Sequence, residues 1–316
     1  GDRLHPANRL SRGTAEAVGV LSRLWKIMQA EAPPADAKRD PAVLLLHGPG
    51  GVYGSDMSRF AIDARQNLHT LEGAHRLLLD AGCDSAVVAE VYLENWLTAE
   101  RLLVIPQLPS LAPPTNDLIE RFLREGGRLL AMGKAPKVSG RPVSWLGSRE
   151  TAKPWQDHIY LPPWKPDLDP VLVRGDCHAV KAGRARVLLR AIPPYDLRHG
   201  VRMGWGIGPA AERPSASAVL TATRVGKGTA WHLACPLFSD YMVGLNFPQL
   251  EWFRKLMREL QPAPASRLES EFGNVEIVTY RHERSAWVYL IHHGGEQFST
   301  VGNAPWRRTV GPVPPY

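Results

Sequence analysis

Two apolar runs separated by an amphipathic segment constrain this sequence more than any other feature. Residues 101–106 form a short apolar run closed by a proline, as in a strand buried on both faces of a parallel sheet. From residue 113, prolines and capping side chains precede apolar positions at helical spacing, and Gly126 and Gly127 end the helix. Residues 128–133 form the second run. The pattern predicts a βαβ unit with a right-handed crossover.

The end of the second strand is where chemistry is expected in such a fold. Open α/β sheets usually hold their active sites just beyond the carboxyl ends of the strands, here at Gly133–Lys134–Ala135. Neither a cysteine nor a serine stands there. The order of elements resembles the class I glutamine amidotransferase-like fold, in which this strand runs into a sharp turn bearing a catalytic cysteine. Gly133 occupies that position, so the sequence keeps the scaffold and lacks that nucleophile.

The other segments extend this sheet. Strands are predicted at 41–46, 85–89, 171–173 and 185–192, a glycine-turn hairpin at 217–234, and helices at 57–80 and 247–260. The predicted fold class is therefore α/β, a flavodoxin-like open parallel sheet of the class I glutamine amidotransferase-like kind. A small all-β piece follows, in which residues 274–280 and 286–291 alternate between apolar and polar.

Proline-rich segments suggest three parts. Residues 1–40 comprise a terminal loop, a helix over 11–31 with one wide apolar face, and a proline- and charge-rich linker. Residues 41–262 form the main amidotransferase-like domain. Residues 263–316 form the small β-domain, which we expect to be incomplete.

Composition excludes several classes of protein. The 316 residues are 44% hydrophobic and 22% charged, as in a globular protein with a sizeable core. The net charge is +7, but lysines and arginines are scattered and do not alternate with aromatic residues, which favours a solvated basic surface over a nucleic-acid groove. No apolar run approaches the ~18 to 20 residues of a membrane span. We therefore expect neither a nucleic acid nor a membrane as partner.

The cysteines favour a reducing compartment. Cys83, Cys177 and Cys235 are far apart and odd in number, which argues against a disulfide framework. A cytoplasmic location is therefore expected. No signal peptide is visible, but the sequence begins at Gly1 rather than methionine, so a secreted parent protein stays open.

The order of segments along the whole chain carries a second resemblance. The segments concerned are Gly1–Pro6 with the helix after it, Gly73–Leu78, the strand that leads to Gly126–Gly127, Tyr195–Asp196, Gly226–Gly228 with its following strand, and Val275–Ile277. In this order they resemble the C-terminal half of a glycoside hydrolase of the α-L-fucosidase-like or β-galactosidase-like kind. In such enzymes a catalytic (β/α)₈ barrel is followed by a β-galactosidase trimerisation domain and a small β-domain.

This resemblance implies a role without chemistry of its own. The amidotransferase-like sheet would serve subunit contact in a homo-oligomer, a trimer, and would close the mouth of the barrel. The two carboxylates that cleave the glycoside would belong to the barrel, which would precede Gly1 and bind the carbohydrate substrate. No cofactor and no metal are implied.

The same resemblance singles out two residues near the start. Residues 1–6 would be the loop after the last barrel strand, and residues 11–31 the last barrel helix. Loops at the carboxyl ends of barrel strands line active sites, which would place Asp2 and His5 near a sugar. The alternative is a plain loop in which Asp2 acts as a cap and His5 is solvated.

Two patterns suggest an independent enzyme instead. Residues 47–51, His-Gly-Pro-Gly-Gly, resemble the oxyanion loop of α/β-hydrolases, but the sequence lacks the accompanying G-x-S-x-G motif. Cys235 follows His232 by three residues, a spacing that turns the two side chains to opposite faces of a strand. We expect a core cysteine and a hydrogen-bonded histidine. A cysteine-dependent amidotransferase-like or hydrolase enzyme remains the alternative.

The remaining candidates concern metals and sugars. Asp176–Cys177–His178 and His292–His293 offer ligand types without a partner motif, so no zinc site is predicted. Residues 143–170 contain three tryptophans and little periodicity, which suggests an insertion or surface arm. These tryptophans would stack on sugar rings, as in a sugar-binding module, or contact a neighbouring subunit. They are Trp145, Trp155 and Trp164.

Overall fold

The structure is a computed structural model. It describes residues 18–19, 22–23, 25–26, 29–30, 32–48, 60–151, 156–165, 167–195, 209–244, 246–261, 264, 266–269, 275–292, 297–301 and 304–308; of these, residues 60–69, 292, 297–301 and 304–308 are described by their backbone alone. The chain divides into two compact units. One comprises residues 1–40 and 279–288, and the other residues 41–278 and 289–316.

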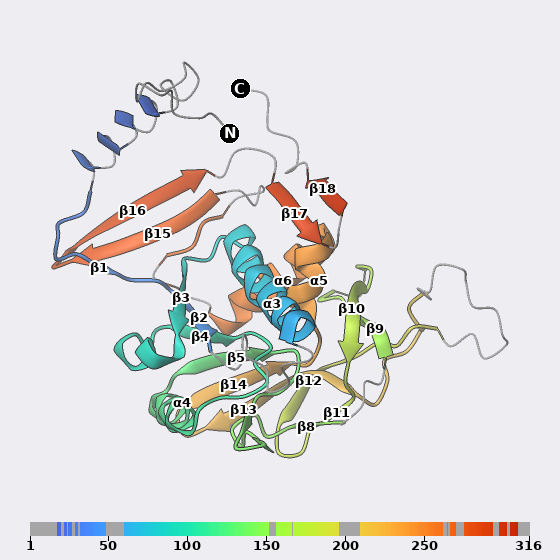
Figure 1. The fold of residues 1–316 in the computed structure, drawn as a ribbon. Helices are drawn as coiled ribbons and strands as arrows, with labels where there is room; N and C mark the ends of the chain where they lie inside the picture. The colour runs from blue at the N-terminus through green and yellow to red at the C-terminus, as the bar shows by residue number, and fades with distance from the viewer. Residues whose placement is uncertain are drawn as a thin grey trace. The chain divides into compact units, whose positions relative to one another are not determined.

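A seven-stranded sheet forms the centre of the larger unit (Figure 1). Its strand order is β12-β13-β14-β5-β4-β2-β3. The five strands from β14 to β3 are parallel, and β13 and β12 extend the sheet in antiparallel fashion. The strands are β2 (Val43–His47), β3 (Ser85–Ala89), β4 (Leu102–Ile105), β5 (Arg128–Met132), β12 (Arg186–Arg190), β13 (Ala218–Val225) and β14 (Gly228–Leu233). The predicted α/β class is confirmed, with a sheet that is mostly and not wholly parallel.

Helices cover both faces of the sheet, because its central strands are apolar on both sides. Leu45, Val104 and Leu130 contribute to a core shared with α3 (Phe60–Asp80), α5 (Leu237–Gly244) and α6 (Phe247–Leu260). Leu44, Leu103 and Leu129 face the other side, beneath α4 (Pro113–Glu125). Figure 1 shows α3, α5 and α6 grouped on one face and α4 on the other.

The predicted βαβ unit is β4, α4 and β5. Two prolines occupy the start of α4, where their missing N–H groups cost no helical hydrogen bond. Ile119, Phe122 and Leu123 are buried, and Gly126 ends the helix with a left-handed φ of 119°. The parallel register pairs Leu103 with Leu129. Strand–helix–strand order, helix bounds and stop signal all follow the sequence pattern.

The tryptophan-rich stretch is more ordered than its sequence suggests. Strand β9 (Gln156–Leu161) pairs with β10 (Val171–Cys177), and Ile159, Leu161 and Val173 enter the main core. The expectation of a surface arm is therefore wrong for this part of residues 143–170. The alternation of apolar residues in β9 was hidden by the prolines that surround it.

Short strands and a 3₁₀ helix complete the larger unit. Strand β8 (Arg149–Glu150) pairs with β11 (Val180–Lys181), and β6 (Lys137–Val138) pairs with β7 (Arg141–Pro142). The 3₁₀ helix η1 (Glu90–Asn95) follows β3 directly. Near the end of the chain, β17 (Gln297–Val301) pairs with β18 (Ala304–Arg308).

A three-stranded sheet joins the linker to the small all-β piece. Its order is β1 (Lys38–Arg39), β15 (Val275–His282) and β16 (Ser285–His292), and the last two confirm the strands predicted there. Arg281 Nε lies 2.7 Å from Asp40 Oδ2, which ties β15 to the linker. Within residues 11–31, the positions that the structure describes are helical, as predicted.

Candidate functional site

The turn after β5 stands where the chemistry of this fold is expected. Gly133 follows the last residue of β5 and has a left-handed φ of 68°. Its N–H donates to the carbonyl of Leu233 at the end of β14, 2.9 Å away. A Cβ at Gly133 would lie 2.6 Å from Oε1 of Gln107. A cysteine at this position would therefore be strained and would displace Gln107, so the local geometry is that of a glycine turn.

A histidine network lies directly beside this turn. His232 on β14 has Nε2 2.9 Å from the carbonyl oxygen of Gly133 and 3.2 Å from Oε1 of Glu150. Two acceptors at Nε2 assign the ring proton to that nitrogen, so Nδ1 accepts from the hydroxyl of Ser148, 3.2 Å away. Ser148, His232 and Glu150 thus stand in the order serine, histidine, acid of a serine hydrolase triad, but with the two ring nitrogens interchanged, since Nε2 faces the serine in that triad.

Burial separates this network from a working triad. Ser148 is 6% exposed and His232 is 1% exposed. The carboxylate of Glu150 also accepts from the backbone N–H of Ala135 at 2.8 Å, which fixes the turn after β5 to β8. Each polar group of the network has a protein partner, and a hydroxyl enclosed in this way is not open to a substrate. The network holds β5, β14 and β8 together at their junction.

The loop after β2 shows a different obstacle to catalysis. Gly48 belongs to the predicted oxyanion loop, of which residues 49–51 lie outside the described part. Glu90 directs Oε1 to the backbone N–H of Ala112 at 2.8 Å, and its Oε2 lies 2.9 Å from where a Cβ on Gly48 would be. A carboxylate in this place would repel a developing oxyanion. The electrostatics at Gly48 therefore disfavour the hydrolase interpretation.

The cysteines are poor nucleophiles. All three are free and buried. Burial raises the pKa of the Cys83 and Cys177 thiols to about 12, and it holds the pKa of Cys235 well above its usual 9.0. Cys235 belongs to the main hydrophobic core, whereas the ring nitrogens of His232 face Ser148 and Gly133. The cysteines therefore stay protonated near neutral pH and contribute packing.

The metal candidates do not converge. Cys177 is buried, and Nδ1 of His178 lies 2.9 Å from the carbonyl oxygen of Thr151. Among the described residues, no group of three or more histidine, cysteine or acidic side chains is arranged to hold a metal ion. His293 lies outside the described residues.

The tryptophan candidates have different environments. Trp145 is 1% exposed, and its indole N–H donates to Oδ1 of Asn116 at 3.0 Å, so the expected surface position is not met. Its large apolar ring fills the core beneath α4 instead. Trp164 packs against Trp252 with ring centroids 5.1 Å apart. The indole N–H of Trp164 donates to the backbone carbonyl of Trp252, and the indole N–H of Trp252 donates to the carbonyl of Pro162. These two bonds hold the segment against α6.

Three of the predicted site residues cannot be placed. Asp2, His5 and Trp155 lie outside the described residues. Conversely, Ser148 and Glu150 could not be recognised from the sequence, because they stand 84 and 82 positions before His232 and belong to no motif that links them to it. The described helices include none with the length and apolar character needed to span a membrane.

Comparison with known proteins gives a likeness of fold. No family model and no curated protein matches the sequence. The α-L-fucosidase isoenzyme 2 from Paenibacillus thiaminolyticus superposes with a TM-score of 0.69 at 19% identity, over 98% of this chain and 46% of that chain. An identity of 19% is so low that the likeness is one of fold alone.

Two β-galactosidases give a similar result. A catalytic mutant of the GH42 enzyme from G. stearothermophilus matches with a TM-score of 0.60 at 14% identity, over 92% of this chain and 40% of that chain. The enzyme from Bacillus circulans sp. alkalophilus matches with a TM-score of 0.57 at 14% identity, over 93% and 41%. This chain therefore spans less than half the length of the glycoside hydrolases that share its fold.

Proposed function

We propose that this chain is the non-catalytic, oligomerising and active-site-closing region of a glycoside hydrolase of the β-galactosidase or α-L-fucosidase type. Almost the whole chain superposes on a minor part of each neighbour, 46% of the fucosidase and 40% of the GH42 galactosidase. The catalytic barrel, with its two carboxylates, then lies outside this chain. The hydrolysis carried out by that barrel, the sugar it binds and the partners of the whole enzyme all belong to this proposal.

The single observation that carries the proposal is the closed carboxyl edge of the sheet. An amidotransferase would hold a thiol at Gly133, where this chain has a left-handed turn packed against Gln107. The nearest histidine, His232, is enclosed in a hydrogen-bonded network. A sheet that has lost access at this edge is suited to packing against other protein surfaces.

The strand order supports the finer assignment of the fold. Read from β3, the parallel strands follow the order β3-β2-β4-β5-β14, which is the 2-1-3-4-5 order of flavodoxin-like sheets. We infer that this is the class I glutamine amidotransferase-like sheet of a β-galactosidase trimerisation domain. On this proposal the protein is a trimer in a cytoplasmic compartment, and Asp2 and His5 approach the sugar when the barrel is present.

Activity and mass measurements test the proposal together. The chain alone should not hydrolyse p-nitrophenyl β-galactoside, p-nitrophenyl α-L-fucoside, p-nitrophenyl acetate or glutamine. Sedimentation equilibrium should give a mass three times that of one chain. In the longer protein that includes the barrel, single Cys83→Ala, Cys177→Ala and Cys235→Ala substitutions should leave glycosidase activity intact.

A specific result would contradict the proposal. Turnover of glutamine or of the ester by this chain, abolished by one cysteine substitution or by Ser148→Ala with the fold retained, would establish an independent enzyme. Circular dichroism of each variant separates loss of chemistry from loss of fold. A strictly monomeric chain at micromolar concentration would remove the oligomerising role.

A further inference from the structure

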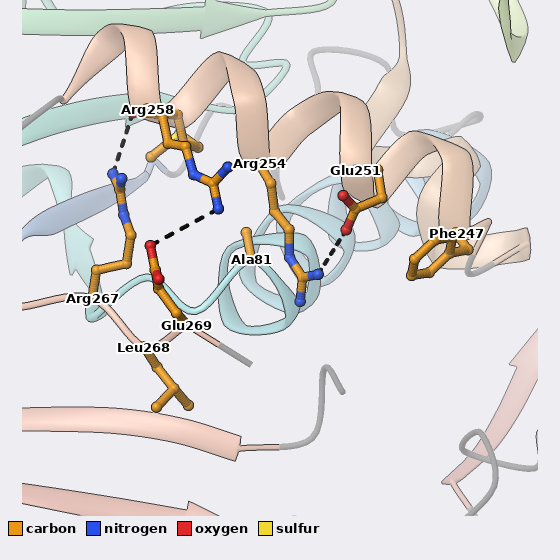
Figure 2. Close-up of a pocket in the computed structure, with 9 residues that line it drawn as sticks. Ala81, Phe247, Glu251, Arg254, Arg258, Arg267, Leu268 and Glu269 are labelled. Carbon is orange, nitrogen blue, oxygen red and sulfur yellow. Dashed lines mark hydrogen bonds and ion pairs between the residues drawn. The ribbon is translucent and has the colours of Figure 1, made fainter. Parts of the chain in front are cut away.

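A charged groove runs along α6, and those of its lining residues that the structure describes all belong to the larger unit. Figure 2 shows side chains of α6 that point toward residues 267–269 across a cavity of about 540 Å³. That volume falls within the ~300–1,000 Å³ of small-molecule sites. Ala81, at the end of α3, lies between the two walls. The groove therefore has the size of a binding site.

One face of α6 supplies most of the groove. Phe247, Glu251, Arg254 and Arg258 recur at intervals of three and four residues, which places them on the same side of the helix. The opposite side is buried in the main core through Leu250, Phe253 and Leu256 among others. The helix is thus fixed by its apolar face, and its polar stripe is held in place without a ligand.

Two of the three arginines are anchored by the protein. Arg254 has Nη1 2.7 Å from Oε1 of Glu251, and its Nη2 donates to the carbonyl of Asp80 at 2.7 Å. Arg267 donates from Nη2 to the carbonyl of Gln261 at 2.9 Å, near the end of α6. Anchored guanidinium groups lose little further rotational freedom when they bind a ligand.

The third arginine is loosely held. Arg258 Nη2 lies 4.0 Å from Oε1 of Glu269, beyond hydrogen-bond distance, and the two side chains are 58% and 81% exposed. An exposed ion pair of this kind contributes little stability. An incoming anion can therefore replace Glu269 at small cost. Because Glu251 is already matched by Arg254, the remaining charges are Arg258 and Arg267 against Glu269.

An exposed aromatic ring stands at the other end of the groove. Phe247 is 60% exposed at the start of α6. It is separated from Arg258 by eleven positions, roughly 16 Å along a helix that rises ~1.5 Å per residue. A ligand that contacts both must be extended, with an apolar face near one end and a negative group near the other.

We propose that this groove binds an anionic oligosaccharide, a chain of sugars that carries a carboxylate or a sulfate ester. Arg258 and Arg267 bind the anion, and Phe247 packs against the apolar face of a sugar ring. The preference for an anion follows from the charges of the groove. The preference for a saccharide rests on the proposed function.

Calorimetry on the intact chain tests the proposal with four probes. Trigalacturonate and a heparin-derived hexasaccharide carry the anions, galactotriose is the neutral counterpart, and sodium sulfate is the free anion. We expect both anionic saccharides to bind at least tenfold tighter than galactotriose and than sulfate. Arg258→Ala should weaken them about tenfold, as expected for the loss of a charge-assisted contact. Phe247→Ala should weaken the saccharides severalfold and leave sulfate binding unchanged.

A matched variant removes the same charge elsewhere. Arg186 is exposed on the edge strand β12, so Arg186→Ala should change saccharide affinity less than twofold. Equal losses in Arg258→Ala and Arg186→Ala would mean diffuse attraction and would overturn the site. The site would also be overturned if galactotriose or sulfate bound as tightly as the anionic saccharides, or if none of the probes bound.

The outcome is separable from that of the proposed function. Self-association that Arg258→Ala abolishes would show that a second copy occupies the groove, and it would overturn the saccharide. A monomeric chain that still binds trigalacturonate through Arg258 would keep the groove and contradict the oligomerising role.

Discussion

The carboxyl edge of the sheet and the groove along α6 both gather polar and charged side chains, but the two sets differ in how far the protein itself satisfies them. At the edge, Ser148 and His232 are buried, Glu150 is partly buried, and each is satisfied by the protein. In the groove, Arg258 and Glu269 are largely exposed and 4.0 Å apart. Polar groups that have completed their hydrogen bonds within the fold stabilise it and leave nothing for a ligand. Polar groups at the surface whose hydrogen bonds are incomplete remain available to a ligand.

The comparison shows that the residue types alone do not locate function in this chain. A serine, histidine and glutamate in triad order are the more suggestive set on chemical grounds. The groove is nevertheless the better candidate for function, because catalysis and binding both require that a ligand reach the side chain.

The largest expected effect comes from opening the network. His232→Leu removes both ring nitrogens and leaves the Ser148 hydroxyl, the Gly133 carbonyl and the Glu150 carboxylate buried without that partner. We expect a loss of about 3 kcal/mol in the free energy of unfolding, measured by urea titration. His178→Leu serves as the control, since His178 makes one hydrogen bond near the surface, and it should lose less than ~1 kcal/mol. A similar small loss in His232→Leu would show that the network does not hold the junction.

A second prediction concerns the buried carboxylate beneath the groove. Asp80 accepts from Arg76 and from the hydroxyl of Tyr241, each at 2.7 Å, while its backbone carbonyl anchors Arg254. Burial raises the pKa of Asp80 above its usual 3.8, and the Arg76 guanidinium offsets only part of that rise. Between the usual and the raised pKa, the folded protein keeps a proton that the unfolded chain has lost. Stability from this group is therefore full below pH ~3.8 and falls as the pH rises through the raised pKa.

Asp80→Asn removes this titration. The difference in unfolding free energy between wild type and variant should therefore shift against the wild type as the pH rises, by no more than about 1.4 kcal/mol per pH unit. Urea titrations from pH 4 to pH 7 measure it. Asp117→Asn, at an exposed position on α4, should follow the wild-type profile. A difference that moves in the opposite direction would mean that Arg76 outweighs burial.

A smaller effect is expected at the contact between Trp164 and Trp252. Trp164→Phe keeps an aromatic ring against Trp252 but removes the indole N–H that donates to the Trp252 carbonyl at 3.0 Å. The expected loss is about 1 kcal/mol in urea unfolding, with no change in trigalacturonate affinity. Weaker saccharide binding in this variant would place the sugar at the tryptophans, as the surface-arm interpretation had it, and not on α6.

Much of the fold could be predicted from the sequence because its signals are local. The proline-to-glycine span of α4, the apolar runs of β4 and β5 and the Gly226–Gly228 hairpin each carry their own start and stop. The hairpin of β9 and β10 was missed because its partners are ten residues apart among prolines. Trp145 was misjudged, because a tryptophan in a proline-rich stretch fits a surface arm as well as a core.

The candidate site was less predictable, for a physical reason. Gly133 was located correctly, since it directly follows a strand whose end the sequence marks. Ser148 and Glu150 reach His232 only through the pairing of β8 with β11 and the parallel register of β14 with β5. The groove likewise depends on where residues 267–269 lie against α6. Contacts of this kind are set by tertiary packing and leave no periodic signal in the chain.

The smallest effect on stability, and the sharpest test of the open side of the comparison, is expected at Glu269. Its side chain is largely exposed and its only ion pair among the described residues is the loose one with Arg258, so Glu269→Gln should change the free energy of unfolding by less than ~0.5 kcal/mol. The same change removes the negative charge that competes with a bound anion. Trigalacturonate should then bind two- to fourfold tighter, while galactotriose is unaffected. Glu283→Gln, in the turn between β15 and β16, removes an equal charge outside the groove and should leave both affinities unchanged. Tighter binding in both variants would reflect net charge alone, and weaker binding in Glu269→Gln would mean that this carboxylate accepts hydrogen bonds from the sugar.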